Sequence, residues 1–526
     1  MKKIVFALMA LAALTLTGCK KELLNTNPTD AVSGDTVFND TDGGLMALNG
    51  TIRFFWQWGE TTTGNYHQCF GPQSYNLMSD LMGEDMVMAA QGNGWFWYDY
   101  LYDVKDMINS TTWRPYDAWN YYYTLISNVN YIIAAAEQMQ GEPALIDYIV
   151  GNAYAFRAYA YAYCGMLYAR SYIGHEDRLC VPIYTEPTVA GTQGKPRATN
   201  REVYAQAMSD INKAIELIGD HSQMHVSHFD KYVANGLKAR IALYMGDYQA
   251  AYDAAKIAVA GGDFAFDKNY HYNDAFDKSV LWGAEIITDQ GTTNPQFLAH
   301  MDIAFGGYGA RARKCCSAWL YDKMGPQDAR RSWWSYEVLA DGSTKGYQQY
   351  KFLFKDASDP QNGADHIFMR APEMQLIIAE TACRLGRESE AKDALNALMK
   401  TRDANYDCSN KTGTELGELT TDLTGSLLEE ILIQRRIELW GEYGRVYDIK
   451  RLRQGFVRTT EMGHPIKGLL TNLATDDPES FDWVMTIPAK EYNANKYILQ
   501  NPVGSYPTSN LEGDDPALAP KVETEE

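Results

Sequence analysis

Apolar residues recur at helical spacing through much of the chain, and they predict a mainly α-helical fold. In the first long stretch, apolar positions lie three or four residues apart at Trp119, Tyr122, Ile126, Val129 and Ile133. This spacing puts them on one face of an amphipathic helix over residues 116–138. The same periodicity predicts helices over 146–169, from Thr199 to Ile218, over 233–244 and over 248–260. Thr199, followed three residues later by a glutamate, also resembles a capping box.

One helical hairpin occurs twice. The segment ALYMGDYQAAYDA (242–254) aligns with ACRLGRESEAKDA (382–394). Gly246 matches Gly386 at the turn, and small alanines match on the second helix. A helix, a glycine turn and a helix with small residues resemble the tetratricopeptide pattern. We therefore predict a scaffold of tetratricopeptide-like hairpins, interrupted by insertions.

The insertions form long loops. The stretches without helical periodicity span residues 84–115, 170–200, 285–315 and 340–366. Long ordered loops on a rigid scaffold are common places for binding sites. Within the last stretch, YQQYKFLF (347–354) alternates polar and apolar residues and predicts a small strand pair. The acidic, proline-containing end, about 509–526, is predicted to be loose.

The start of the chain has the features of an export signal. Lys2 and Lys3 precede a mostly apolar run that ends at Leu16, which is too short to span a bilayer. Leu16-Thr17-Gly18-Cys19 follows and resembles a lipobox, in which the thiol accepts a diacylglyceryl group. We predict a signal peptide over 1–18 and a single lipid-anchored domain over 19–526. Several acyl chains such as palmitate hold a protein far better than one, so the membrane contact is expected only through this anchor.

The net charge argues against nucleic acid as a partner, and the cysteine content argues against a disulfide framework. The net charge is −20 and the pI is about 4.9, so the chain repels phosphate backbones and nucleic acid is not an expected partner. Of the eight cysteines, Cys19 is assigned to lipid, and the odd remainder at irregular spacing does not form a disulfide framework. Cys164 and Cys383 fall within helical patterns and are expected to be buried.

Aromatic residues make up 13% of the chain, with 36 tyrosines and 12 tryptophans. This is more than a core needs. Exported binding proteins use tyrosine and tryptophan as rigid faces that present contact area at low entropic cost. The composition therefore favours a binding protein.

No motif indicates catalysis. The chain contains no H-E-x-x-H, G-x-S-x-G, Walker or Rossmann pattern, so neither an enzyme nor a cofactor is predicted. His221, His225 and His228 have helical spacing, but Gly219-Asp220 should end the helix before them, and no metal site is predicted. A glycosidase needs two carboxylates at a set separation. The acidic groups Glu429-Glu430 and Asp80, Glu84, Asp85 are expected on solvated faces instead.

Five motifs follow one another along the chain. They are an opening segment (23–52), a W-x-x-x-Y-x-x-I-x-x-x-N helix (119–135), a G-E-A-x-x-x-R-A-Y helix (151–168), a charged segment (427–451) and a closing segment (487–502). In this order they resemble the motifs of the SusD/RagB family, the nutrient-binding lipoproteins of Bacteroidota. Asn152 and Gln434 each replace a glutamate of the family pattern. The charged residues of the fourth motif are expected to form a network that locks the C-terminal helix: Arg435, Arg436, Glu438, Glu442, Arg445 and Asp448.

The resemblance implies a SusD-like fold, mainly α with minor β, on the outer face of the outer membrane. It implies capture of an oligosaccharide or polysaccharide and its transfer to a SusC-like TonB-dependent transporter. A peptide-binding RagB-like receptor is an alternative, and a glycoside hydrolase or a purely structural partner of the transporter are others. The residues themselves do not decide between glycan and peptide.

The loop Gly92–Tyr98 carries the chemistry that glycan capture requires. Sugar rings have apolar C–H faces that stack on aromatic rings, and their hydroxyls take hydrogen bonds from amides and guanidinium groups. Glycines flanking Asn93 predict a turn that exposes the aromatics. We expect Trp95 and Trp97 to stack on a ligand, with Asn93 and Tyr98 beside them.

A second loop, Phe305–Arg313, contains a similar combination of aromatic and polar side chains. Tyr308 could stack on a sugar ring, and Arg311 could form a forked contact with hydroxyls or a carboxylate. Trp333-Trp334 is a third, weaker candidate for which packing is the favoured interpretation, and Trp56 and Trp58 are interpreted as core.

Overall fold

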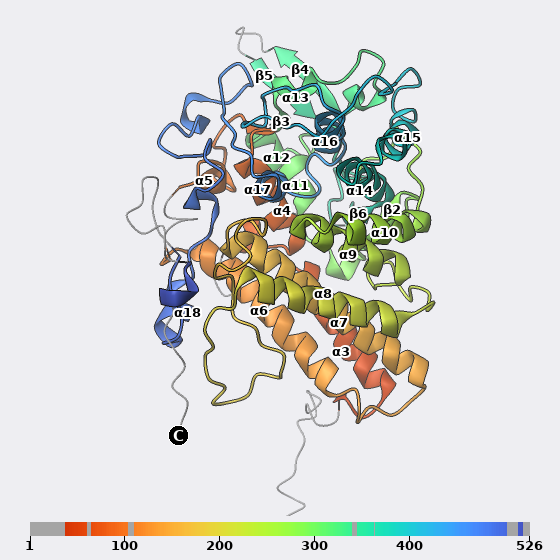
Figure 1. Cartoon of the computed structure of the whole chain (residues 1–526), viewed down its shortest axis with the longest axis vertical. Helices are drawn as coiled ribbons and strands as arrows, with labels where there is room; N and C mark the ends of the chain where they lie inside the picture. The colour runs from red at the N-terminus through yellow and green to blue at the C-terminus, as the bar shows by residue number, and fades with distance from the viewer. Residues whose placement is uncertain are drawn as a thin grey trace, which may run out of the picture.

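A computed structural model of the chain describes residues 37–59, 65–103, 110–338, 344–361, 363–501 and 514–518. The predicted signal peptide and Cys19 lie outside these residues, as do residues 23–36 of the 23–52 motif. Helices dominate, and the strands form small sheets, so the prediction of a mainly α fold with minor β is confirmed (Figure 1). No helix in the described ranges is long and apolar enough to cross a membrane.

The scaffold is a series of helices that pack on their neighbours in the chain. Its members are α6 (Trp113–Ala134), α7 (Pro143–Tyr168), α8 (Asn200–Ile218), α9 (Lys231–Met245), α10 (Tyr248–Ala258), α14 (Ala371–Arg384), α15 (Glu388–Met399) and α16 (Leu427–Glu438). Each packs on the next from α6 to α10, and α10 then packs on α14 (Figure 1). The two repeated hairpins, far apart in sequence, therefore lie side by side.

Local signals set the ends of these helices as predicted. The side chain of Thr199 accepts a hydrogen bond from the backbone of Glu202, and the side chain of Glu202 accepts one from the backbone of Thr199, so the capping box is present. Gly246 and Gly386 end the first helices of the two hairpins at φ values of 77° and 75°. This left-handed conformation favours glycine, which explains why glycine stands at the same place in both repeats.

The remaining elements pack around the scaffold on several sides (Figure 1). They are α3 (Thr41–Trp56), η2 (Tyr66–Gln68), α4 (Pro72–Met82), α5 (Trp97–Tyr100), α11 (Phe297–Met301), α12 (Tyr308–Arg311), α13 (Ala318–Tyr321), α17 (Arg445–Leu452) and α18 (Ala489–Ala494). One sheet has the strand order β1 (Met86–Met88), β3 (Lys314–Cys316), β5 (Thr344–Gln349), β4 (Trp334–Val338). The other pairs β2 (Val280–Ala284) with β6 (His366–Arg370).

The strand prediction was shifted. The alternating segment 347–354 was expected to be the strand, whereas β5 ends at Gln349 and pairs with β3 and β4. Lys351 and Phe352 instead turn into the core, where both are buried. The alternation of polar and apolar residues therefore indicated a largely buried stretch, but the strand ends earlier than it predicted.

The tyrosines are used differently from the prediction. Many are fully buried between the scaffold helices, among them Tyr75, Tyr121, Tyr148, Tyr161 and Tyr163. Their hydroxyls are satisfied inside: Tyr121 donates to the carbonyl of Phe55 at 2.6 Å, and Tyr161 donates to the carbonyl of Tyr184 at 2.7 Å. A buried tyrosine keeps its apolar area and costs little when the hydroxyl has an acceptor. The high aromatic content is therefore largely a property of the core.

The C-terminal tail is not loose throughout. Residues 514–518 are described, and Asp514 is 2% exposed. Its carboxylate accepts from Arg170 at 2.9 Å, and its carbonyl accepts from the backbone of Leu179 at 2.8 Å. The prediction of a loose tail is wrong for these residues, because an aspartate paired with a partly buried arginine holds the segment against the body.

Candidate functional site

The two candidate loops meet because β1 and β3 pair antiparallel. Met88 at the end of β1 lies opposite Lys314 at the start of β3. The pairing continues one step further, where the backbone of Ala89 donates to the carbonyl of Arg313 at 3.2 Å. The loop that leaves β1 and the loop that enters β3 must therefore lie next to each other.

Glycine is required where the first loop approaches the second. A Cβ on Gly92 would lie 2.7 Å from the Cβ of Ala312 and 3.0 Å from the carbonyl of Arg311. Gly92 also has a φ of 54°. Both the space and the backbone conformation exclude larger residues. The turn closes with a hydrogen bond from Gly94 to the carbonyl of Gln91 at 2.9 Å, as the glycine pair predicted.

Four aromatic side chains gather at this junction. Trp95 stacks on His67 with centroids 4.8 Å apart and planes 20° apart, and it meets Tyr308 edge-on at 6.0 Å. Tyr66 lies against His67 at 4.4 Å, and Trp58 lies against Tyr66 at 5.5 Å. We call Tyr66, His67, Trp95 and Tyr308 the aromatic platform. Trp95, His67 and Tyr308 are partly exposed, and Tyr66 is exposed.

Hydrogen bonds hold the platform rings in place. The hydroxyl of Tyr308 lies 2.7 Å from Nδ1 of His67. Burial lowers the pKa of His67, so its imidazole is neutral near pH 7 and Nδ1 can accept the hydroxyl proton. Below them, His300 is fully buried and Nε2 donates to the carbonyl of His67 at 2.7 Å. Its ring lies 5.0 Å from Tyr308. Burial, and then the nearby charge of Lys314, lower the pKa of His300 far below its ordinary value.

A buried arginine fixes the segment that carries His67. Arg114 is fully buried and forms a forked ion pair with Asp99, with distances of 2.9 and 2.8 Å. Its third contact is the carbonyl of Gln68, at 3.2 Å. The side chain of Gln68 in turn accepts from the backbone of Phe96 at 2.5 Å. The rigid helix α6, which supplies Arg114, therefore positions both sides of the platform.

Polar groups stand at the edge of the platform. Arg311 donates to the amide oxygen of Asn93 at 3.4 Å, and both side chains are exposed. Tyr98 is 39% exposed and its ring lies near Gly94. The structure therefore brings together five of the six predicted ligand contacts, namely Asn93, Trp95, Tyr98, Tyr308 and Arg311.

Trp97 is the exception. It is 6% exposed and packs on Tyr100 with centroids 5.6 Å apart, so it cannot present a face to a ligand. Phe96 between the two tryptophans has a φ of 61°, which reverses the chain and starts α5. Trp95 consequently faces outward, while Trp97, the first residue of α5, faces the core. The prediction of a stacking role for Trp97 is wrong.

His67 and Tyr66 were not found from the sequence. The signal that could have indicated them is the group of aromatics between Trp56 and Phe70, in a stretch with little helical periodicity. Trp56 is buried as predicted, but Trp58 is 38% exposed and extends the line of rings beyond Tyr66. Trp333 and Trp334 are both 3% exposed, so the packing interpretation is confirmed for them.

Comparison with known proteins gives the family. Residues 68–243 match a SusD-like family described as "Starch-binding associating with outer membrane", and residues 303–504 match the SusD family itself. This chain belongs to the SusD/RagB family. The resemblance of its five motifs is thereby confirmed at the level of the family.

Relatives of this SusD/RagB protein cover nearly its whole length. SusD-like protein P38 of Formosa agariphila is 22% identical over 89% of this chain and 94% of its own length. SusD-like protein P2 of the same organism is 22% identical over 93% of this chain and 97% of its own length.

Solved structures share the fold. A SusD-like carbohydrate binding protein from Bacteroides vulgatus has a TM-score of 0.74 at 23% identity, covering 88% of this chain and 97% of that one. A laminarin-binding SusD-like protein has a TM-score of 0.62 at 17% identity, covering 88% and 98%.

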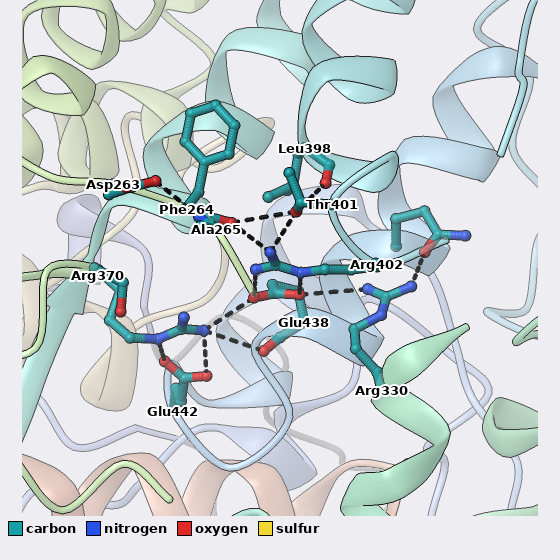
Figure 2. A network of polar contacts seen from close by, with 12 residues as sticks. Asp263, Phe264, Ala265, Arg330, Arg370, Leu398, Thr401, Arg402, Glu438 and Glu442 are labelled. Carbon is teal, nitrogen blue, oxygen red and sulfur yellow. Dashed lines mark hydrogen bonds and ion pairs between the residues drawn. The ribbon is translucent and has the colours of Figure 1, made fainter. Parts of the chain in front are cut away.

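The charged SusD/RagB motif of residues 427–451 is buried. Figure 2 shows Glu438, which is fully buried, held by both nitrogens of the Arg402 fork at 3.1 and 2.7 Å and by Arg370 at 3.2 Å. Arg330 adds a contact at 3.5 Å. Burial alone would raise the pKa of Glu438, but the arginines bring it far below its ordinary value. Glu442 pairs with Arg370 at 2.7 Å in the same cluster. The predicted network exists and contacts no part of the platform.

The other charged residues of the motif join distant elements. Arg436 pairs with Glu84 at 2.8 Å and Asp85 at 2.6 Å, and Arg445 also pairs with Glu84 at 2.8 Å. Arg435 pairs with Asp448 at 2.8 Å. The expectation that Asp80, Glu84 and Asp85 lie on a solvated face is therefore wrong, because all three are buried. Glu84 and Asp85 pair with arginines, and the carboxylate of Asp80 accepts from the backbone of Arg445 at 2.9 Å. The same holds for Glu429, which is 9% exposed and accepts from the backbone of residues 424 and 425.

The histidines at 221–228 are engaged in packing. His228 is buried, with Nδ1 3.1 Å from the hydroxyl of Tyr148 and Nε2 3.0 Å from Asn49. His221 stacks on Tyr148 with centroids 4.2 Å apart. Within the part of the chain that the structure describes, no group of three His, Cys, Asp or Glu is arranged to hold a metal ion. Cys164 and Cys383 are buried free thiols, as predicted.

Proposed function

We propose that this SusD/RagB protein is a cell-surface lipoprotein that binds an oligosaccharide or polysaccharide and passes it to a SusC-like TonB-dependent transporter. The observation that carries the proposal is the aromatic platform, edged by the Asn93–Arg311 pair. Two ring faces and a fork of donors are what a sugar requires: an apolar surface for the C–H face and partners for the hydroxyls. The platform has no need of a catalytic group.

The comparisons support the same class of ligand. One matching family is described as starch-binding, and two structural neighbours are called carbohydrate-binding and laminarin-binding. The outer-membrane association in the family description supports a surface location. Binding without cleavage is supported by the acidic residues of the core, since Glu84, Glu438 and Glu442 are each paired with arginine and have side-chain exposures of 0%, 0% and 15%.

Affinity electrophoresis of the mature protein against a panel of polysaccharides tests the proposal. We expect retardation by at least one glycan without shortening of its chains. Trp95→Ala should weaken that retardation by about 30-fold or more in Kd, because loss of a central aromatic contact costs about 2 kcal/mol or more. Tyr336→Ala is the matched control, since Tyr336 is 51% exposed and lies on β4, away from the platform. Equal retardation of Trp95→Ala and wild type would refute the platform assignment, and release of sugars would indicate an enzyme.

The lipid anchor and the transporter need separate tests. Cys19→Ala should move the protein from the membrane fraction to the soluble exported fraction and abolish incorporation of labelled palmitate. Co-purification of a tagged wild-type protein from its native membranes should recover a TonB-dependent transporter. Retention of Cys19→Ala in the membrane fraction would contradict the anchor assignment.

A further inference from the structure

A groove distinct from the aromatic platform lies along helix α6. It has a volume of about 590 Å³ and lies between α6, the segment 184–195 and α18. Pockets for small ligands typically have volumes of about 300–1,000 Å³. In Figure 1, α18 stands beside α6 at the edge of the molecule. The contact is direct, because Nζ of Lys490 lies 3.9 Å above the ring of Tyr116. None of the platform residues lines this groove.

Helix α6 forms the floor, and several of its half-buried polar side chains have no hydrogen-bond partner among the described residues. Thr124, Ser127 and Asn128 line the groove, and their side chains make no hydrogen bond within the described part of the chain. Asn120 lies one turn earlier and accepts from Tyr116 at 3.3 Å, which leaves its NH₂ group without a described partner. Residues three and four apart share a helix face, so these groups form a row of donors and acceptors along the floor.

The segment 184–195 is a rigid wall. Near its start, the carbonyl of Tyr184 accepts from Tyr161 at 2.7 Å and from Asn130 at 3.0 Å. At its far end, the backbone of Lys195 donates to the hydroxyl of Tyr184 at 2.9 Å. Asn495 after α18 donates to the carbonyl of Lys195 at 2.9 Å. The wall is thus tied to the scaffold and to α18 before any ligand arrives, which reduces the entropy lost on binding.

The lining is neutral although the protein is strongly acidic. Among the residues that line the groove, only Lys490 and Glu491 are charged. Both are already engaged, Lys490 on the ring of Tyr116 and Glu491 as acceptor from Asn495 at 3.0 Å. The rest of the lining consists of aromatic rings, amides, hydroxyls and small apolar groups. Tyr123 and Tyr184 present partly exposed rings that meet at 6.0 Å.

We propose that this groove is a second carbohydrate site, which binds a neutral oligosaccharide independently of the aromatic platform. Partly exposed aromatic rings suit the C–H faces of sugars, and uncharged amides and hydroxyls suit their hydroxyl groups. Lys490 is the one cation among the described lining residues, and Glu491 beside it offsets its charge, so the lining has no net positive charge to favour an anionic ligand such as a uronate or phosphate. A long glycan that contacts both sites gains affinity through effective concentration.

The test measures oligosaccharide binding to the groove in a variant whose aromatic platform no longer binds. Trp95→Ala is screened against a panel of neutral and acidic oligosaccharides, and the hits are titrated by calorimetry. Ser127→Trp is then added to fill the groove. Ser209→Trp is the matched control, because Ser209 is an exposed serine on helix α8 that does not line the groove. Circular dichroism and thermal unfolding establish that each double variant is folded.

We expect at least one neutral oligosaccharide to bind Trp95→Ala, to lose at least tenfold in affinity with Ser127→Trp, and to be unaffected by Ser209→Trp. Asn128→Ala should weaken the same ligand, whereas Asn212→Ala, an exposed asparagine on α8, should not. The Asn128 variant keeps the test valid if Ser127→Trp fails to fold. Binding only of acidic sugars, no binding to Trp95→Ala, or equal effects of the paired variants would each overturn the proposal. Since platform and groove are disabled separately, failure of one site is distinguishable from failure of the other.

Discussion

Two buried lysines provide a matched test of what holds the protein together. Lys314 in β3 is 1% exposed, and its Nζ has no hydrogen-bond partner among the described residues. Lys450 in α17 is 7% exposed, and its Nζ donates to the carbonyls of Met166 at 2.5 Å and Ala169 at 2.6 Å. These carbonyls belong to the C-terminal end of α7, where helix carbonyls lack partners of their own. Methionine has a similar length without the charge. Comparing Lys→Met at the two sites therefore separates the cost of burying the amine from the benefit of its hydrogen bonds.

The expected magnitudes follow from the pKa values. Burial lowers the pKa of Lys314 and of Lys450 to about 7, from 10.5. One pKa unit corresponds to about 1.4 kcal/mol, so the penalty for placing either lysine in the folded protein is roughly 3–5 kcal/mol. Lys314→Met removes this penalty and loses no hydrogen bond, so it should raise the free energy of unfolding at pH 7 by roughly 2–4 kcal/mol after relaxation of the packing. Lys450→Met also leaves two carbonyls unsatisfied, at about 1–3 kcal/mol each, and should be less stable than Lys314→Met by about 2–6 kcal/mol.

The sign of the pH dependence follows from proton binding. Between about pH 7 and 10.5 the unfolded chain holds a proton on Lys314 that the folded chain has lost. Stability of the wild type therefore rises with pH across this window through this group. Lys314→Met lacks the contribution, so its advantage over wild type should be largest at pH 7 and below and should shrink towards pH 10.5.

Urea denaturation of the mature protein, followed by far-ultraviolet circular dichroism at pH 6, 7, 8.5 and 10, measures these differences. Lys314→Met should show a higher midpoint with an unchanged slope. The reasoning is wrong if Lys314→Met is less stable than wild type, or if its advantage does not change with pH. Either result would mean that the amine has an acceptor or a counter-charge. Equal stability of the two methionine variants would refute the role of Lys450 as a cap of α7.

Three further predictions concern the buried charges and the loop. Glu438→Gln should lower the free energy of unfolding by about 3–5 kcal/mol, because its arginines lose a buried counter-charge. Glu216 is the control: it lies in an exposed ion pair with a side-chain exposure of 68%, and Glu216→Gln should change the free energy of unfolding by less than about 1 kcal/mol in the same urea titration. Equal losses in the two variants would contradict this. Trp97→Ala should lower the free energy of unfolding by about 3–5 kcal/mol, because it empties a buried site. The folded variant should bind its glycan with an unchanged Kd in affinity electrophoresis. A large loss of affinity in a folded variant would instead show that Trp97 contacts the ligand. The pKa of Glu84 falls to about 2, since Arg445 and Arg436 outweigh the effect of burial. This group should therefore leave the melting temperature unchanged between about pH 5 and 7 and lower it between about pH 4.5 and 2. A melting temperature that is flat down to pH 2 would be inconsistent with these pairs.

Most of the scaffold could be predicted from the sequence because its signals are local. The periodicity of α6 and α7, the capping box at Thr199 and the glycine turns at Gly246 and Gly386 each involve residues within a few positions of one another. Such signals act on the backbone directly and are visible in a short window. The order of the family motifs was also readable, because each motif is a continuous segment.

The candidate site could be predicted only in part. Trp95 and Tyr308 were found because glycine-rich aromatic loops stand out in the sequence, but their contact depends on the pairing of β1 with β3. His67 lies in a segment without a distinctive pattern, and its place under Trp95 is set by Arg114 and His300, which come from distant parts of the chain. The acidic residues were misassigned for the same reason: their arginine partners are hundreds of positions away, as for Glu84 and Arg436.

The sequence by itself determined the class of the fold, the family and the chemistry of the loops. Only the tertiary structure decided which side chains of these loops face outward. Trp95 and Trp97 are two residues apart in one loop and have the same chemistry, yet the reversal at Phe96 turns one outward and the other into the core. Exposure of a side chain depends on everything that packs around it, and no local pattern encodes that. Helix and turn signals are properties of neighbouring residues, whereas a binding surface is a property of distant ones.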